Sequence, residues 1–305
     1  MPSGLRVRTV RSGEVSLALA EAGEPVRPTM VMIHGYPDTK EVWAPVMERL
    51  AADFHVVAYD VRGAGASGAP GPAAAYDLKR LGDDFAAVCG AVSPDEPVHL
   101  VGHDWGGIQG WDFVCDPRFA GAIASFTSIA GPALGHAVQA PRRAVRSGRW
   151  GAAFARARRS WYVLPLCLPG GPQLAWRVVI GPRRWRRYLE LEGVPTDPGY
   201  PSPTLCADGL NGAKLYRRNI PRRILSRRPG AVQRAHAPVQ LIVPAGDRFI
   251  SPSYYDAAQR AAPGLRRRVI PGSHWAIRTE PARVSEWVAE FARGASAPET
   301  PGVER

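Results

Sequence analysis

Residues 98–107 read VHLVGHDWGG, and this stretch decides how the rest of the chain is interpreted. Its apolar run, Val98–Val101, predicts a strand, and the residues after Asp104 predict the start of a helix. Gly102 and Gly106 permit a strained strand-to-helix turn that lifts the side chain between them clear of a sheet. Asp104 is therefore a candidate nucleophile, and an aspartate in this position is equally typical of a helix N-cap.

Other short apolar runs, bounded by Gly, Pro or Asp, occur on both sides of this turn. Runs without polar alternation are typical of strands that are covered on both faces of a parallel sheet. The sequence therefore predicts an α/β fold with a mostly parallel central sheet and helices on both faces. The predicted strands are Leu5–Arg11, Val15–Ala20, Thr29–Ile33, His55–Tyr59, Gly121–Ile129, Val239–Val243 and Arg268–Ile270, with helices at Asp77–Val92 and Pro281–Arg293.

The alternation of strands and helices is interrupted between residues 132 and 229. This segment is rich in Arg and Trp, is punctuated by Pro and Gly, and shows no strand-like alternation. We predict that residues 132–229 form a helical cap inserted into a core built from residues 1–131 and 230–294. Residues 295–305, with the sequence ASAPETPGVER, are predicted to form a polar tail.

Asp247 and His274 follow the last two predicted strands, in the segments PAGD and PGSHW. Enzymes with this elbow place an acid and then a base after the nucleophile, and parallel sheets carry their sites at the carboxyl ends of strands. Each residue also has a structural interpretation, Asp247 as a turn residue and His274 as a loop histidine that caps the last helix. Because the loop after Gly121–Ile129 offers Ser128 but no carboxylate, Asp247 is the better partner for His274.

The segment HGYP at residues 34–37 follows another predicted strand. In elbow enzymes, a backbone N–H of this loop and the N–H after the nucleophile stabilise an oxyanion. These donors would be the amides of Tyr36 and Trp105, because Pro37 has no N–H. A tight turn with a buried tyrosine is the structural alternative. Around this loop we expect a substrate pocket lined by His34, Pro37, Trp105, Trp161 and Trp275.

The composition excludes several classes of protein. With 305 residues, 45% of them hydrophobic and 22% charged, the chain is typical of a globular protein and not of a disordered, collagenous or coiled-coil one. Its four cysteines show no metal-ligand spacing, so we expect no metal site and reduced thiols. The N-terminus has no apolar signal core, and no apolar run is long enough to span a membrane, which predicts a cytoplasmic protein.

Several segments together resemble the epoxide hydrolases of the α/β-hydrolase superfamily. They are HGYP (34–37), DVRGAGAS (60–67), GHDWGG (102–107), GD (246–247) and GSHW (272–275). The resemblance extends from about residue 5 to residue 293. It implies the α/β-hydrolase fold with an inserted helical cap, a small hydrophobic epoxide as substrate, and neither a metal nor a cofactor.

The resemblance also implies two tyrosine hydroxyls in the cap that hold the epoxide oxygen. Ser160-Trp161-Tyr162 and Leu215-Tyr216-Arg217-Arg218-Asn219 resemble the two cap sites, which assigns this role to Tyr162 and Tyr216. Packing of the cap by buried tyrosines is the structural alternative. The chain departs from the family at Leu166-Cys167, where many members have Phe-Gln, and this departure bears on pocket shape and substrate size.

The implied reaction has two stages. Asp104 opens the strained ring by backside attack while the two cap tyrosines donate to the alkoxide, which leaves an alkyl ester on the enzyme. His274, oriented by Asp247, then deprotonates a water that attacks the ester carbonyl. The two loop amides stabilise the resulting oxyanion, and the product is a vicinal diol.

Two other functions are compatible with these residues. A haloalkane dehalogenase would use the same aspartate and ester but needs two N–H donors for the halide, which the indoles of Trp105, Trp161 and Trp176 could supply. Tyr36 stands where such enzymes commonly have Asn, and fluoroacetate-type dehalogenases carry Arg where this chain has Trp105. A non-catalytic binding module on the same fold would not need the acid–base pair.

Positive charge is concentrated in one part of the chain. The formal net charge is +12, and residues 140–228 alone carry +15. No zinc-finger spacing, helix-turn-helix pattern or RNP-like aromatic run accompanies this charge, so nucleic-acid binding is not predicted. Pro141–Tyr162 is predicted to form a basic amphipathic helix that could rest on anionic lipid or attract acidic substrates such as epoxy fatty acids. A solvated, arginine-rich face that reflects a GC-rich genome is the alternative.

Overall fold

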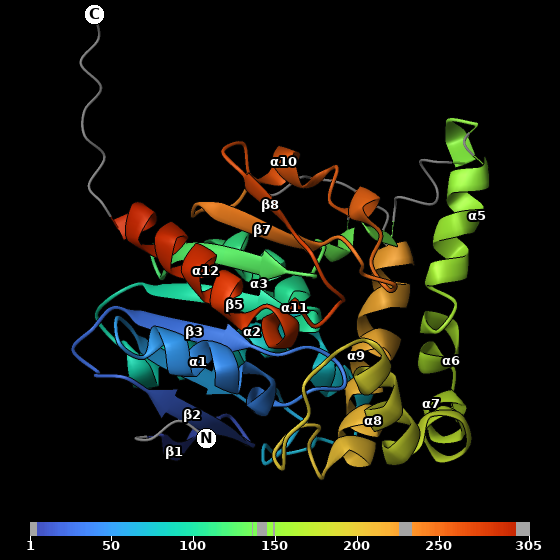
Figure 1. The fold of residues 1–305 in the computed structure, drawn as a ribbon, viewed down its shortest axis with the longest axis horizontal. Coiled ribbons are helices and arrows are strands. Elements are labelled where there is room, and N and C mark those ends of the chain that lie inside the picture. Colours follow the sequence, from blue (N-terminus) through green and yellow to red (C-terminus); the bar gives the residue numbers. More distant parts are fainter. Residues whose placement is uncertain (1–4, 136, 139–144, 149, 226–233, 297–305) are drawn as a thin grey trace, which may run out of the picture.

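The computed structural model describes residues 5–135, 137–138, 145–148, 150–225 and 234–296. Within these residues an eight-stranded sheet forms the centre of the molecule (Figure 1), with the strand order β1-β2-β4-β3-β5-β6-β7-β8. β2 is antiparallel to β1 and β4, and the other neighbouring strands are parallel. The strands are β1 (Arg6–Ser12), β2 (Val15–Ala22), β3 (Thr29–Ile33), β4 (His55–Tyr59), β5 (Val98–His103), β6 (Ile123–Ile129), β7 (Val239–Pro244) and β8 (Arg266–Ile270).

The predicted α/β architecture with a mostly parallel sheet is confirmed, whereas β1, β2, β5, β6, β7 and β8 each differ from the predicted bounds by one or two residues. Two of these differences have a clear physical reason. β5 continues to His103, two residues beyond the apolar run, because His103 still pairs with Ile129 of β6. β6 begins at Ile123, two residues later than predicted, because Gly121 has a φ of +82°, which does not fit a strand.

Helices cover both faces of the sheet, which explains why β3 is apolar from Met30 to Ile33. Val31 and Ile33 pack with the side chains of α2 and α3, whereas Met30 and Met32 pack on the other face with α1 and α12. Successive side chains of a strand point to opposite faces, so a strand covered on both sides has no polar position. The core helices are η1 (Lys40–Trp43), α1 (Ala44–Leu50), η2 (Ala73–Tyr76), α2 (Leu78–Val92), α3 (Trp105–Val114), η3 (Pro117–Phe119), η5 (Pro252–Tyr254), α10 (Ala258–Ala261), α11 (Ala276–Thr279) and α12 (Pro281–Ser296).

The helices between β6 and β7 form a cap over the end of the sheet to which the parallel strands point (Figure 1). The last of them is held against the core by polar contacts. Asn219 Nδ2 donates to the Tyr76 carbonyl oxygen at 2.9 Å, and Arg218 and Arg222 form ion pairs with Asp77. The cap helices are α5 (Trp150–Arg159), α6 (Val163–Cys167), α7 (Gly171–Leu174), η4 (Ala175–Ile180), α8 (Gly181–Leu191) and α9 (Leu205–Leu225).

Two predicted segments differ from the structure or lie partly outside its described residues. In the predicted helix Pro141–Tyr162, residues 141–144 and 149 are not described, and the described helix α5 ends at Arg159, so Tyr162 is not part of it. The next helix, α6, begins at Val163 and carries Pro165 in its first turn, where proline is tolerated. In the predicted polar tail, the first two residues belong to α12, and residues 297–305 lie outside the described residues.

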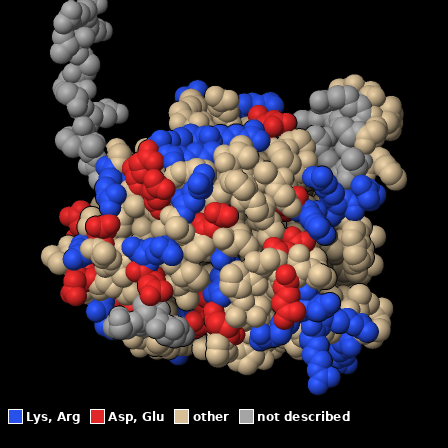
Figure 2. Space-filling model, in the orientation of Figure 1, with Lys and Arg blue, Asp and Glu red and all other residues tan. Residues whose placement is uncertain are grey.

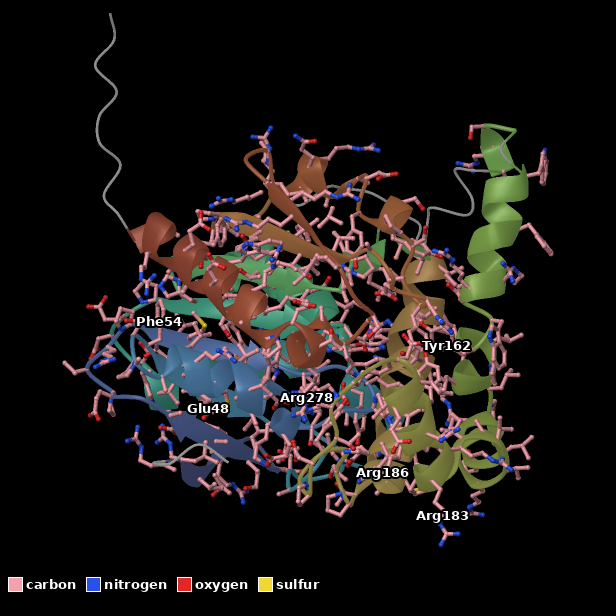
Figure 3. All side chains as sticks on the ribbon, viewed as in Figure 1. Glu48, Phe54, Tyr162, Arg183, Arg186 and Arg278 are labelled. Atoms are coloured by element: carbon pink, nitrogen blue, oxygen red, sulfur yellow. The ribbon has the colours of Figure 1, made fainter. Side chains whose placement is uncertain are left out.

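Exposed arginines gather on α8, at the lower right of Figure 2, and Figure 3 labels Arg183 and Arg186 at that end of the cap. Tyr162 lies about midway along the cap in the same view, between α5 and α8. Among the described helices, none combines the length and the apolar character needed to cross a membrane.

Candidate active site

The turn between β5 and α3 has the strained geometry that its glycines predict. Asp104 has a φ of 49°, a conformation that few side-chain-bearing residues adopt, and its amide donates to the Ile129 carbonyl oxygen at 3.0 Å. A Cβ on Gly106 would lie 2.0 Å from the Ile33 carbonyl oxygen, so only glycine fits there. The Asp104 side chain makes no capping hydrogen bond to α3. Its carboxylate is thus presented to the end of the sheet instead of capping the helix.

Two backbone amides bind the Asp104 carboxylate. The Tyr36 amide donates to Asp104 Oδ2 at 2.9 Å, and the Trp105 amide is close enough to lower the pKa of this carboxylate. These are the two amides that the sequence predicts as oxyanion donors. Tyr36 reaches the carboxylate because the loop after β3 crosses directly over the turn, where a Cβ on Gly35 would lie 2.5 Å from the Asp104 Cβ.

The predicted acid and base form a hydrogen-bonded pair beside Asp104. His274 Nδ1 lies 2.8 Å from Asp247 Oδ2, and His274 Nε2 lies 3.8 Å from Asp104 Oδ1. The other Asp247 oxygen accepts the amides of Phe249 and Ile250, at 2.7 and 2.9 Å. Asp247 is therefore fixed by its own loop and directs Nε2 of His274 toward Asp104.

Burial and charge set the protonation of these three groups. Burial lowers the pKa of His274, but the charge and hydrogen bond of Asp247 and the charges of Asp104 and Asp38 outweigh it and raise the pKa to about 9. Burial tends to raise the pKa of Asp247, yet its contacts with His274 lower that pKa overall. Burial raises the pKa of Asp104, and the charge of His274 and the two amides offset only part of this effect. At neutral pH, His274 thus carries a proton between two carboxylates.

The cap brings Tyr162 and Tyr216 to the same place. Their ring centroids are 6.4 Å apart, and the Tyr216 ring lies 4.8 Å from that of Trp105. Burial, together with the charge of Asp104, raises the pKa of both phenols well above its ordinary value, so both stay protonated. Tyr216 accepts a hydrogen bond from the Trp105 indole. Among the described residues no acceptor takes the proton of either hydroxyl, so each has a donor to offer.

The remaining predicted pocket residues lie in different environments. His34 is buried and both ring nitrogens contact backbone groups, Nδ1 with the Gly35 carbonyl at 2.8 Å and Nε2 with the Val61 amide at 2.9 Å, so the ring braces this loop. Pro37 and Trp275 are also buried. Trp161, in contrast, is 67% exposed on the cap.

The indole N–H groups that could bind a halide either donate to tyrosine hydroxyls or belong to an exposed ring. Trp105 donates to Tyr216. Trp176 Nε1 donates to the Tyr36 hydroxyl at 2.7 Å, and that hydroxyl donates in turn to the Gly209 carbonyl at 3.0 Å. The Trp161 ring is mostly exposed. No two of these indoles converge as free donors.

Asp38 is a buried residue of the site that sequence reasoning missed. One carboxylate oxygen accepts the Trp275 indole N–H and the other accepts the Tyr200 hydroxyl, both at 3.0 Å. Burial raises the pKa of Asp38 to about 6, although these two hydrogen bonds oppose the change. Its position directly after HGYP, at the end of a strand, is the signal that could have revealed it.

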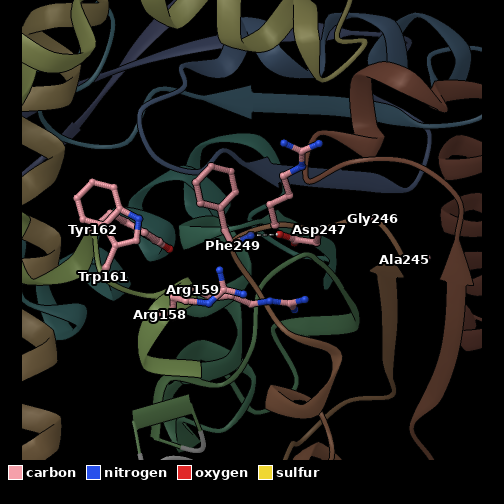
Figure 4. A pocket seen from close by; sticks show the side chains of 9 residues that line it. Arg158, Arg159, Trp161, Tyr162, Ala245, Gly246, Asp247 and Phe249 are labelled. Carbon is pink, nitrogen blue, oxygen red and sulfur yellow. Dashed lines mark hydrogen bonds between the residues drawn. The ribbon is translucent and has the colours of Figure 1, made fainter. Parts of the chain in front are cut away.

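A cavity of about 560 Å³ lies between the cap and the loop that carries Asp247 (Figure 4). Arg158, Arg159, Trp161 and Tyr162 line it from the cap, and residues 245–249 line it from the core. Because Tyr162 belongs to both the cavity and the tyrosine pair, a molecule bound by that pair can extend into this space. Among the described residues, no group of three or more His, Cys, Asp or Glu side chains is placed to hold a metal ion.

The chain is similar to several known proteins. Residues 28–165 match the alpha/beta hydrolase fold family. The "Probable oxidoreductase EphD" of Mycobacterium tuberculosis is 36% identical over 283 residues, covering 91% of this chain and 48% of that protein. "Epoxide hydrolase A" of the same species is 28% identical over 322 residues, covering 94% of this chain and 97% of that protein.

Solved structures show the same fold. An epoxide hydrolase from Bacillus megaterium matches with a TM-score of 0.76 at 21% identity, covering 94% of this chain and 100% of that one. An epoxide hydrolase from Vigna radiata matches with a TM-score of 0.73 at 22% identity, covering 95% and 98%. The predicted α/β-hydrolase fold is thereby confirmed. The chain spans about half the length of EphD.

Proposed function

Because the chain has the α/β-hydrolase fold and is similar to epoxide hydrolases, we propose that it hydrolyses an epoxide to a vicinal diol. One observation carries this proposal. A buried carboxylate at the elbow lies within reach of a His–Asp pair and close to two phenols whose protons no described acceptor takes. A nucleophile, a base and acids for a leaving oxygen are the groups that epoxide opening and ester hydrolysis require.

In the first stage, an oxygen of Asp104 attacks a ring carbon as the ring C–O bond breaks. Tyr162 and Tyr216 donate hydrogen bonds to the ring oxygen, and one of them transfers its proton to the alkoxide. The Trp105 indole donates to Tyr216, which orients that hydroxyl and helps to stabilise a phenolate. The products of this stage are a neutral alkyl ester on Asp104 and a free hydroxyl on the substrate.

In the second stage, the uncharged ester no longer raises the pKa of His274, and the ring gives its proton to the tyrosinate. Neutral His274 then removes a proton from water, and the water oxygen attacks the ester carbonyl carbon of Asp104. The amides of Tyr36 and Trp105 stabilise the tetrahedral oxyanion. Collapse of this intermediate expels the second diol oxygen, which takes a proton from His274, and the carboxylic acid left on Asp104 then protonates His274 and restores the resting charges.

The contacts of the indoles favour this reaction over dehalogenation. A halide site needs at least two free N–H donors that point to one spot. Here Trp105 donates to the Tyr216 hydroxyl, Trp176 donates to the Tyr36 hydroxyl, and Trp161 is 67% exposed. Of the two hydroxyls that receive these bonds, that of Tyr216 is one of the pair proposed to act on an oxygen leaving group.

Intact mass spectrometry of a trapped ester tests the proposed function. His274→Ala should react with an epoxide and gain the whole mass of that epoxide, because the base that removes the ester is absent. Adding Asp104→Asn should abolish the gain. A gain of a haloalkane mass less HX would instead establish a dehalogenase. No adduct with any epoxide or haloalkane of a broad panel, together with unchanged ligand binding, would favour a non-catalytic binding module.

We also propose peripheral contact between the cap and an anionic membrane, in keeping with the predicted basic amphipathic segment. Large apolar side chains are exposed on α5 to η4, including Trp150 at 65% and Phe154 at 72%. Residues 117–189 contain many arginines and no acidic residue. Apolar side chains set among cations suit the interface of an anionic bilayer.

Co-sedimentation with phosphatidylcholine vesicles, with and without phosphatidylglycerol, tests the membrane proposal. The protein should bind more to the anionic vesicles, and Trp150→Ser/Phe154→Ser should remove most of this binding. Val7→Ser, which changes a similarly exposed residue of β1, is the matched control. Equal binding to both kinds of vesicle would refute the proposal.

A further inference from the structure

The side chain of Tyr36 reaches from the core into the cap. Its hydroxyl accepts the indole N–H of Trp176 at 2.7 Å and donates to the Gly209 carbonyl oxygen at 3.0 Å. Burial raises the pKa of this phenol, so the hydroxyl keeps the proton that it donates. The amide of the same residue donates to Asp104 Oδ2 at 2.9 Å. Tyr36 is therefore bonded at one end to the proposed nucleophile and at the other end to two segments of the cap.

Two glycines of α9 make room for this contact. Gly209 and Gly212 are three residues apart, so they lie on one side of the helix. A Cβ on Gly209 would lie 2.0 Å from the Trp176 ring, and a Cβ on Gly212 would lie 2.7 Å from the Tyr36 ring. Glycine destabilises a helix interior relative to alanine. Alanine at either position would therefore favour the helix itself but would block one of the two rings.

Trp176 is the residue that anchors η4 to the rest of the molecule. Its side chain is 2% exposed, whereas those of Val178 and Val179 are 59% and 58% exposed. The segment is a π-helix, a rare form that is frequent at functional sites. The neighbouring ring of Trp185 lies 5.9 Å away between centroids, but its indole nitrogen has no hydrogen-bond partner among the described residues. Within this aromatic cluster, the bond to the Tyr36 hydroxyl is specific to Trp176.

The loop that carries Tyr36 is held from two sides. On the core side, the His34 ring contacts the Gly35 carbonyl at 2.8 Å. On the cap side, the Tyr36 ring packs edge-on against Tyr216, with 5.2 Å between ring centroids, and its hydroxyl is bonded to the cap. Because a tyrosine side chain has only two rotatable bonds, a ring fixed at its edge and its hydroxyl restricts the backbone that carries it. Loss of the hydroxyl contact would leave the Tyr36 amide less well fixed.

We propose that Trp176 is a positioning residue of the oxyanion hole: through the Tyr36 hydroxyl, it keeps the Tyr36 amide directed at Asp104 Oδ2. This inference rests on the proposed function and adds a contribution of the cap to its second stage. The cap then acts in both stages, because Tyr162 and Tyr216 serve opening of the ring and Trp176 serves hydrolysis of the ester.

The two stages respond differently to the Tyr36 amide. In the first stage, Asp104 loses its negative charge as the ester forms, so a donor to Oδ2 stabilises the reactant more than the product. In the second stage, negative charge develops on the ester carbonyl oxygen, and the donor stabilises the tetrahedral intermediate. A displaced Tyr36 amide should therefore slow hydrolysis of the ester without slowing its formation.

Single-turnover mass measurements with an epoxide test this role. In Trp176→Phe, hydrolysis of the ester should be at least about tenfold slower, which is less than the roughly 10²- to 10³-fold effect of losing an oxyanion donor outright, because the amide is displaced and not removed. Formation of the ester should slow by less than about twofold, so the ester accumulates. Tyr36→Phe removes the same bond from the core side and lacks only the hydroxyl oxygen, so it keeps the test open if Trp176→Phe does not fold. The double variant should hydrolyse the ester no more slowly than either single variant, since both remove one bond.

Trp185→Phe is the matched control, because it makes the same change in the same aromatic cluster and removes an indole N–H that has no acceptor among the described residues. It should change neither rate by more than about twofold. A packing defect would instead slow formation of the ester, since the Tyr36 ring contacts Tyr216. Normal ester hydrolysis in Trp176→Phe and Tyr36→Phe, or equal slowing of both stages, would overturn the positioning role while leaving epoxide hydrolysis intact.

The NMR signal of the Tyr36 amide separates failure of this inference from failure of the proposed function, because it needs no substrate. The chain has nine tyrosines, so ¹⁵N-tyrosine labelling gives a simple spectrum, in which the signal absent from Tyr36→Phe is that of Tyr36. A weaker bond to Asp104 should move the amide proton upfield in Trp176→Phe, and Trp185→Phe should leave it in place. If the signal moves but the wild type hydrolyses no epoxide, the positioning stands and the proposed function fails. An unmoved signal refutes the positioning role, and together with no hydrolysis it refutes both.

Discussion

The charge of Asp104 should control the pKa of His274, and this coupling can be tested directly. His274 Nε2 lies 3.8 Å from Asp104 Oδ1, and the anionic neighbours of His274 raise its pKa to about 9. Asp104→Asn removes one of these charges and keeps an amide oxygen that can accept the Tyr36 N–H. We expect the pKa of His274 to fall in this variant.

The magnitude follows from the geometry. The pKa of His274 is raised from 6.5 to about 9, which corresponds to about 3 kcal/mol of preference for the charged ring. Asp247 contributes most of this through its charge and hydrogen bond, and Asp104 and Asp38 contribute the rest against the effect of burial. An opposite charge at about 4 Å changes a pKa by about 1 to 3. Removing Asp104 should therefore lower the pKa of His274 by about 1 to 2.

Titration of ¹⁵N-histidine-labelled protein by NMR measures this pKa, and His274→Gln identifies the signal. The same neutralisation occurs in the reaction, because the ester on Asp104 carries no charge. The rate of hydrolysis of a preformed ester can be measured by rapid mixing at a series of pH values. This rate should increase with pH as His274 loses its proton. The midpoint of this increase should lie below 9.

Asp38→Asn is the control for a general effect of charge, because Asp38 contributes less to the pKa of His274 than Asp104 does. It should lower the pKa of His274 by a smaller amount. Equal titration of His274 in wild type and Asp104→Asn would refute the coupling. The loss of the His274 proton upon ester formation, which the second stage requires, would then lack its physical cause.

Three further outcomes are expected. Tyr216→Phe and Tyr162→Phe should each slow formation of the ester by about 10²- to 10³-fold but change the rate of its hydrolysis by less than about tenfold. Single-turnover mass measurements separate the two stages, and equal slowing of both would indicate a packing role. Asp38→Ala leaves the Trp275 indole and the Tyr200 hydroxyl without an acceptor, so urea denaturation should show a loss of about 2–5 kcal/mol in the free energy of unfolding. A loss below about 1 kcal/mol would contradict the contacts described. Gly106→Ala would place a Cβ 2.0 Å from the Ile33 carbonyl oxygen, and circular dichroism and soluble yield should show little folded protein; a wild-type yield with full activity would refute the close approach.

The elbow and its partners could be predicted from the sequence because their signals are local. Glycines two residues either side of Asp104 specify the turn, and an apolar run specifies the strand before it. Asp247 and His274 follow strands whose carboxyl ends meet at one edge of a parallel sheet. Once the strands are placed, the convergence of these residues follows from topology, and the 2.8 Å contact of the pair bears it out.

The contacts between cap and core could not be predicted in the same way. The bond from Trp176 to the Tyr36 hydroxyl joins residues 140 positions apart, and nothing in either segment signals the other. The spacing of arginines and aromatic residues predicts a helix to Tyr162, whereas α5 ends at Arg159. The two ring nitrogens of His34 contact backbone groups of its own region, and only the folded loop reveals these contacts.

The resting contacts of Asp104 explain how one set of donors serves both proposed stages. At rest, the Tyr36 amide donates to Asp104 Oδ2, while His274 faces Oδ1 from the other side. If Oδ1 attacks the epoxide, Oδ2 becomes the ester carbonyl oxygen and keeps its contact with the Tyr36 amide. When water then adds to the ester carbon, negative charge develops on Oδ2, where the donors are already placed and need no reorganisation. The turn that strains Asp104 is thus what holds its two oxygens in different environments, one toward the base and substrate and the other toward the amides.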